Sequence, residues 1–118
     1  MKRTHLLLAA SVVALVVTSA ATPMTPAKLA GTVGPGFTIS LKRAGMTVRT
    51  LKAGRYTLTV SDKAGIHSFE IEGPGLDREI TGVSFVGTKT VTVVLKRGTY
   101  KYYCKPHESS MHGSFKVT

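Results

Sequence analysis

From Gly36 onward, apolar and polar side chains alternate along short segments that glycine-containing turns separate. Alternation over about four to eight residues is the pattern of a half-buried β-strand. Such segments are found at residues 37–41, 56–60, 67–71, 90–95, 99–104 and 113–117, and a further short strand is expected at 46–51. No window of about 11 residues here has helical apolar spacing. The pattern predicts an all-β domain, a two-sheet sandwich of seven or eight antiparallel strands.

Two regions of the sequence lack this alternation. Residues 76–87 are less regular, and we expect them to loop across one end of the sandwich. Residues 22–35 are rich in proline, glycine, alanine and threonine, and we expect a flexible lead-in there. A chain of 118 residues has room for one domain. We therefore assign residues 36–118 to that domain.

The N-terminus has the three-part organisation of a secretory signal peptide. Lys2 and Arg3 precede an apolar run at residues 6–17, and small residues follow at 18–21. The alternative, a membrane anchor, is disfavoured because the apolar core of about a dozen residues is short against the roughly 20 that span a bilayer. We predict that residues 1–21 are cleaved near Ala20 or Ala21. The protein is then exported to the periplasm or beyond, without a transmembrane anchor.

The chain is strongly basic, with 16 lysines and arginines against 6 acidic residues. Loss of Lys2 and Arg3 with the signal still leaves 14 basic residues and a net charge of about +8. Such a surface attracts nucleic acid, anionic lipid or an acidic protein. Export argues against nucleic acid, and the basic residues are scattered rather than clustered. We expect an acidic redox protein as the partner and a monomer as the oligomeric state.

The only cysteine of the chain is Cys104, so no internal disulfide can form. In an oxidising compartment an unpaired thiol is expected to be buried, reactive or bound to a metal. A Cys–His hydrolase built from Cys104 and His107 leaves Met111 and His67 without a role. The carboxylates of residues 70–79 have no nucleophile or cleft beside them, and we expect solvated edge charges rather than acid–base catalysts. The sequence thus gives no support to an enzyme.

A thiolate, an imidazole and a thioether lie within eight residues of one another, on a single predicted loop between two strands. They belong to Cys104, His107 and Met111, and Pro106 stiffens the turn before the histidine. Two histidines and one cysteine in trigonal arrangement, with a weak axial methionine, form the blue-copper electron-transfer site. His67, which opens a predicted strand directly after a turn, is the candidate for the missing imidazole.

These residues resemble the plastocyanin and azurin group of cupredoxins over residues 36–118. The resemblance rests on three motifs, Tyr102-Tyr103-Cys104-x-Pro106-His107, Met111-x-Gly113-x-Phe115 and His67-x-Phe69. It implies a Greek-key sandwich of about eight strands with one mononuclear type 1 copper ion per chain, cycling between Cu(I) and Cu(II). By motif position it implies equatorial ligands at His67, Cys104 and His107 and an axial ligand at Met111, with His107 as the electron port.

Three features qualify the resemblance. Three residues separate His107 from Met111, as in azurins, whereas plastocyanins usually have four. Ser68 stands where the family commonly has asparagine, and a hydroxyl makes fewer hydrogen bonds than an amide, so we expect a less rigid surrounding of the cysteine loop. His112 could replace Met111 as a ligand, but neighbouring strand residues point opposite ways, so we expect Met111 inward and His112 outward.

The sequence predicts a one-electron carrier. A copper-binding protein for storage, delivery or resistance, without an electron-transfer partner, is the alternative. A third reading, an accessory module with a partial site, is disfavoured because all four candidate ligands are present.

Overall fold

The computed structural model describes residues 9–18 and 25–118. Residues 9–18 form neither helix nor strand. The remainder contains ten strands and one short 3-10 helix: β1 (Ala27–Val33), β2 (Ile39–Arg43), β3 (Met46–Thr47), β4 (Thr50–Leu51), β5 (Gly54–Asp62), β6 (Phe69–Gly73), β7 (Leu76–Thr81), β8 (Gly87–Leu95), β9 (Gly98–Tyr103), η1 (Lys105–His107) and β10 (His112–Val117). Among these residues no helix is long and apolar enough to span a membrane.

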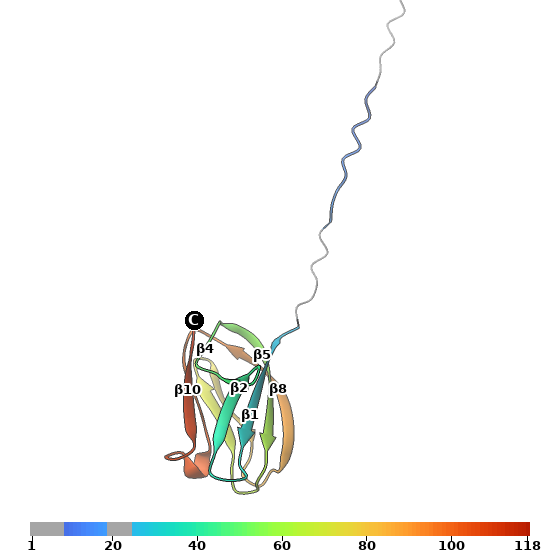
Figure 1. Cartoon of the computed structure of the whole chain (residues 1–118). Helices are drawn as coiled ribbons and strands as arrows, with labels where there is room; N and C mark the ends of the chain where they lie inside the picture. The colour runs from blue at the N-terminus through green and yellow to red at the C-terminus, as the bar shows by residue number, and fades with distance from the viewer. Residues whose placement is uncertain (1–8, 19–24) are drawn as a thin grey trace, which may run out of the picture.

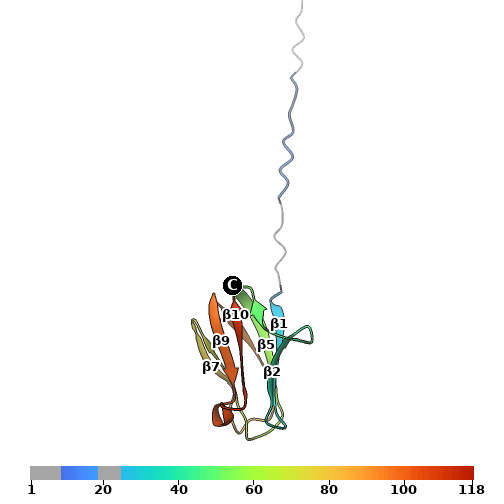
Figure 2. The same ribbon diagram turned by 60° about the vertical axis from the view of Figure 1, so that its left-hand side comes forward.

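The strands form two five-stranded sheets, with strand orders β3-β2-β1-β5-β8 and β4-β10-β9-β6-β7. Figures 1 and 2 show the sheets as the two layers of a sandwich, with the C-terminus at one end and η1 at the other. The predicted all-β sandwich is therefore confirmed. Most strand pairs are antiparallel, but β1 pairs parallel with β5 and β10 pairs parallel with β4, so both sheets are mixed.

The core lies between the sheets and follows the alternation of the sequence. In β5, Tyr56, Leu58 and Val60 are buried, and the residues between them are partly exposed. In the other sheet the rings of Tyr100 and Phe115 stack with their centroids 5.4 Å apart. The buried apolar side chains of both sheets form one cluster between the layers, as in other two-sheet sandwiches.

The prediction of a flexible lead-in at residues 22–35 is wrong for most of its length. β1 occupies Ala27–Val33 and pairs with β5 over all seven of its residues. The inward position between Leu29 and Val33 is Gly31, whose missing side chain leaves room for the Phe69 ring; a Cβ there would lie 2.8 Å from Phe69 Cε2. A glycine at an inward position hides the alternation. Residues 22–24, and residues 1–8 and 19–21 of the predicted signal peptide, lie outside the described residues.

Two other expectations need correction. Residues 76–81 do not loop but form β7, an edge strand that pairs with β6. Only its last two residues are buried, so its sequence carries little apolar signal. The single strand expected at 46–51 is two short strands, β3 and β4, which belong to different sheets. At this point the chain crosses from one layer of the sandwich to the other.

Candidate metal centre

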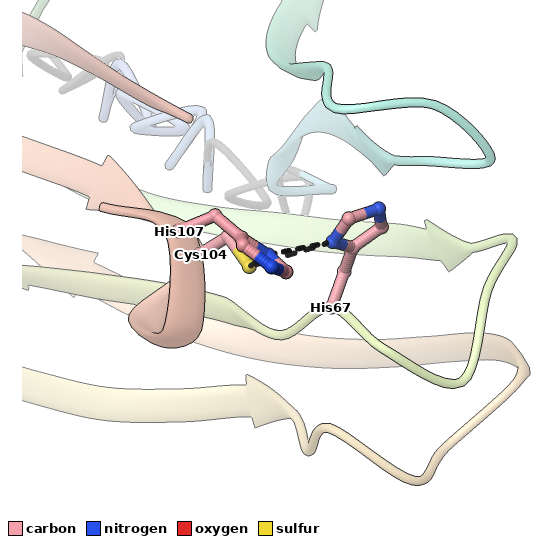
Figure 3. A group of neighbouring side chains, drawn as sticks. All are labelled: His67, Cys104 and His107. Atoms are coloured by element: carbon pink, nitrogen blue, oxygen red, sulfur yellow. Dashed lines mark hydrogen bonds between the residues drawn. The ribbon is translucent and has the colours of Figure 1, made fainter. Parts of the chain in front are cut away.

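The fold brings three of the predicted site residues together at the end of the sandwich that carries η1 (Figures 1 and 3). His67 lies on the connection from β5 to β6, Cys104 follows β9 directly, and His107 ends η1. Adjacent strands cause this meeting, because β6 pairs with β9 in a register that places Glu70 opposite Tyr103. The residues just before β6 and just after β9 therefore lie side by side at the same end of the sheet.

The potential ligand atoms of these three residues face one another (Figure 3). The two Nδ1 atoms of His67 and His107 are 3.2 Å apart, and Cys104 Sγ lies 3.7 Å from the first and 3.6 Å from the second. A point equidistant from three atoms so placed is about 2.0 Å from each, close to the 2.0 to 2.3 Å of metal bonds to imidazole nitrogen and thiolate sulfur. The donor set and its spacing fit a trigonal copper centre.

Solvent reaches the three residues unequally. His67 and Cys104 are fully buried, whereas His107 is partly exposed. The His67 Nε2 atom is buried and has no hydrogen-bond partner among residues 9–18 and 25–118. The centre is thus closed toward the core, and its contact with solvent is through the His107 side.

Met111 and His112 differ sharply in exposure. Met111 is fully buried, and its backbone joins the other two loop residues: its N–H donates to the His107 carbonyl at 2.8 Å, and its carbonyl accepts from the Cys104 N–H at 3.0 Å. His112 is exposed, and its Nδ1 lies 2.7 Å from the Glu108 carbonyl oxygen. The two backbone hydrogen bonds of Met111 close the loop from Cys104 to Met111 and hold its backbone in one conformation.

Ser68 connects the two segments that carry the site. Its backbone N–H donates to Cys104 Sγ at 3.3 Å, and its hydroxyl oxygen accepts from the Lys105 N–H at 2.9 Å. The hydroxyl proton goes to Glu70 Oε2. Ser68 thus makes contacts on both sides of the peptide that follows the cysteine.

Glu70 is not the solvated edge charge that we expected. Glu70 is only 6% exposed, and the pairing of β6 with β7 shifts register between Phe69 and Glu70. Burial raises the pKa of the Glu70 carboxyl, the hydrogen bond from Ser68 acts against this rise, and the neighbouring charge of Glu79 adds to it.

Phe37 is a site residue that the alternation pattern misplaced. It lies in the connection before β2 rather than in a strand, and it is 60% exposed. Its ring meets both imidazoles edge to face, with centroids 5.4 Å from His67 and 4.9 Å from His107. The glycines at 34 and 36 mark the segment as a loop and were the available signal. Phe37 forms part of the outer cover of the centre.

Tyr103 precedes the cysteine and gives a pH prediction. Desolvation raises the pKa of its phenol from 10.0 to about 12, and the negative charges of Glu72 and Glu70 contribute. Because the folded state holds this proton more tightly, the free energy of unfolding is expected to fall as pH rises from about 10 to 12. The difference between the tyrosinate absorbance curves of wild type and Tyr103→Phe should have its midpoint near 12. A midpoint near 10 would contradict this assignment.

Comparisons with known proteins agree with this geometry. Residues 50–118 match the family described as copper binding proteins, plastocyanin/azurin family. Similar solved structures include one of rusticyanin (24% identity, TM-score 0.57, 77% of this chain and 76% of that chain) and one of rusticyanin from Thiobacillus ferrooxidans (27%, 0.53, 77% and 76%). Reduced rusticyanin is also similar (26%, 0.54, 77% and 78%). No curated protein sequence matches the chain significantly.

The family match covers more than half of the chain and contains all three residues whose donor atoms converge. The solved structures share the sandwich fold. The chain belongs to the plastocyanin/azurin family of copper-binding proteins, the cupredoxins.

Proposed function

We propose that this protein is an exported one-electron carrier that holds one type 1 copper ion with His67, Cys104 and His107 as equatorial ligands and Met111 as axial ligand. The convergence of the two Nδ1 atoms and Cys104 Sγ is the observation that carries the proposal. Bound copper would supply a centre that accepts and releases one electron. The protein's part is to fix the donor atoms so that they move little between the two oxidation states.

The residues around the centre suit this task. Cys104 and His67 are fully buried, and the hydrogen bonds of the loop from Cys104 to Met111 limit its movement. His107 is the ligand candidate that reaches the surface, which favours it as the place where electrons enter and leave. Its partial exposure lets a partner approach without opening the fold.

The test is a titration of the purified protein with Cu(II), followed by visible absorption beside a Cys104→Ser variant. We expect an intense blue band that saturates at one equivalent and is absent from the variant, because the band requires a copper–thiolate bond. A colourless wild type, or equal copper binding by the variant, would contradict the proposed centre.

A second measurement separates an electron carrier from a copper store. NMR line broadening in mixtures of the Cu(I) and Cu(II) forms gives the rate of electron exchange between molecules. Fast exchange with slow loss of copper to a chelator supports the carrier. Slow exchange with rapid loss supports storage, delivery or resistance.

The partner that we propose is an acidic redox protein, because 14 basic against 6 acidic residues, a net charge of about +8, remain once Lys2 and Arg3 are lost with the signal peptide. Opposite charges accelerate association at low ionic strength, and salt screens them. The bimolecular rate of electron transfer to an acidic partner, measured by stopped flow, is expected to fall as salt concentration rises. A rate that does not depend on salt would contradict this choice of partner.

Export to the periplasm or beyond is tested by sequencing the N-terminus of the protein recovered from those fractions.

Phe37 gives a prediction about retention of the metal. Aromatic pairs contribute about 0.5 to 1.5 kcal/mol each, and Phe37 makes two of them with the imidazoles. We expect Phe37→Ala to raise the rate of copper loss to a chelator roughly tenfold. Val86→Ala is the matched control, because Val86 has nearly the same exposure, 61%. An equal effect of the two substitutions would show that Phe37 has no specific part.

A further inference from the structure

Ser68 has one hydroxyl proton and two polar neighbours. The hydroxyl receives a hydrogen bond from the Lys105 N–H at 2.9 Å and donates its own to Glu70 Oε2. Hydroxyl groups rotate to suit their partners, so the strongest acceptor nearby decides where the proton points. A buried carboxylate is a stronger acceptor than any neutral group. When the Ser68 hydroxyl proton points toward Glu70, a lone pair of Ser68 Oγ is directed at the Lys105 N–H.

The Lys105 N–H belongs to the peptide bond that follows Cys104. Ser68 therefore contacts the cysteine twice, once at Sγ through its backbone and once at this peptide through its hydroxyl. Only the second contact depends on how the hydroxyl is turned. Glu70 does not itself touch the converging donor atoms in any of these bonds, and its effect passes through Ser68.

We propose that Glu70 is a positioning residue of the metal centre, which orients the Ser68 hydroxyl and so fixes the Cys104–Lys105 peptide. Glu70 is 6% exposed, and burial of a carboxyl group is costly unless it is hydrogen-bonded. The hydrogen bond that the Glu70 carboxyl accepts from the Ser68 hydroxyl therefore accounts for a buried carboxyl group at this position. The inference rests on the proposed function for the role of Cys104 as a ligand, but the hydrogen-bond relay itself does not require the metal.

Amide hydrogen exchange of Lys105 in the metal-free protein tests the relay directly. Glu70→Leu replaces the carboxyl group by an apolar side chain of similar size, and we expect it to raise the exchange rate of the Lys105 amide roughly tenfold, as loss of one hydrogen bond predicts. Glu70→Gln retains an acceptor oxygen and should restore protection. Ser68→Ala should raise exchange as much as Glu70→Leu, and the double variant should add nothing further.

Global stability separates positioning from a merely structural role. Replacing a buried charged group by an apolar one of similar shape is often neutral or stabilising. Glu70→Leu should therefore loosen the Lys105 amide without lowering the urea midpoint. Glu72→Leu, on the same strand two residues further, is the matched control and should leave Lys105 unchanged. In the copper-loaded protein, Glu70→Leu but not Glu72→Leu should shift the reduction potential and the blue band.

Three results would overturn the proposal: unchanged Lys105 exchange in Glu70→Leu or in Ser68→Ala, equal effects of Glu72→Leu, or full additivity of the two site substitutions. Ser68→Ala keeps the test decisive if Glu70→Leu does not fold. If wild type gives no blue band while Lys105 still responds to Glu70, the proposed function fails and the relay stands. If the blue band forms but Lys105 exchange does not respond to Glu70→Leu, the relay fails and the proposed copper centre stands.

Discussion

Loading the metal-free protein with copper is expected to raise its thermal unfolding midpoint by about 15 to 30 °C. A ligand at a thousand times its dissociation constant stabilises the folded state by about 4 kcal/mol, and each kcal/mol shifts the midpoint of a domain this small by about 4 to 8 °C. The folded chain already holds the donor atoms 3.2 to 3.7 Å apart. In the unfolded chain His67 and Cys104 are 37 residues apart, so closing the site there costs chain entropy.

Differential scanning calorimetry of the metal-free and copper-loaded forms measures this shift. Cys104→Ser is the control, and we expect copper to raise its midpoint by a few degrees at most, because the thiolate ligand is missing. A small shift in wild type, or an equal shift in the variant, would contradict a preformed centre built on Cys104.

Gly73→Ala is expected to destabilise the protein by about 3 kcal/mol, at the upper end of the usual cost of overpacking a core. A Cβ at this position would lie 2.3 Å from Tyr100 Cδ1. Tyr100 cannot move aside easily, because it is fully buried and its hydroxyl donates to the Pro74 carbonyl at 2.6 Å and accepts from the Lys96 N–H at 2.8 Å. Urea denaturation, with the midpoint converted through the slope, gives the loss.

Gly36→Ala is the matched control for this substitution. In the described part of the chain, a Cβ at Gly36 meets no atom within 4 Å apart from those of its two chain neighbours. Its effect should stay within about 0.5 kcal/mol, as for other surface changes. If Gly73→Ala were as mild, the ring of Tyr100 would have to be freer than its two hydrogen bonds indicate.

The sequence predicts much of this fold because long strands with a clean alternation are their own signal. β5 and β9 turn every second side chain inward, so their apolar residues show the register directly. The alternation pattern does not predict β1 and β7, for two different reasons. β1 has Gly31 at an inward position filled by the Phe69 ring, and β7 lies at a sheet edge where few side chains are buried. Their assignment needed the neighbouring strands.

The metal centre, too, has residues that the sequence predicts and residues that it does not. Cys104, His107 and Met111 lie on one short loop, so their proximity is local and could be predicted from spacing alone. The roles of Phe37 and Glu70 arise only when segments that are distant in the sequence meet. The expectation of weak support from Ser68 considered its hydroxyl alone, whereas Glu70 accepts the hydroxyl proton and leaves the Ser68 oxygen to accept from the Lys105 N–H of the loop. Glu70 is buried at a shift in strand pairing that no periodicity shows.

The position of the chain ends has a practical consequence for attaching this protein to a surface. Thr118 is held by hydrogen bonds with Leu51 and Ala53, and β1 starts at the same end of the sandwich (Figure 1). β10 begins beside the metal centre at His112 and runs to that end at Val117, and its six residues span about 20 Å. A linker fused at Thr118 would orient every molecule on an electrode with His107 facing the solution. If the protein carries electrons as we propose, its immobilised form should then exchange them with dissolved partners more readily than with the electrode.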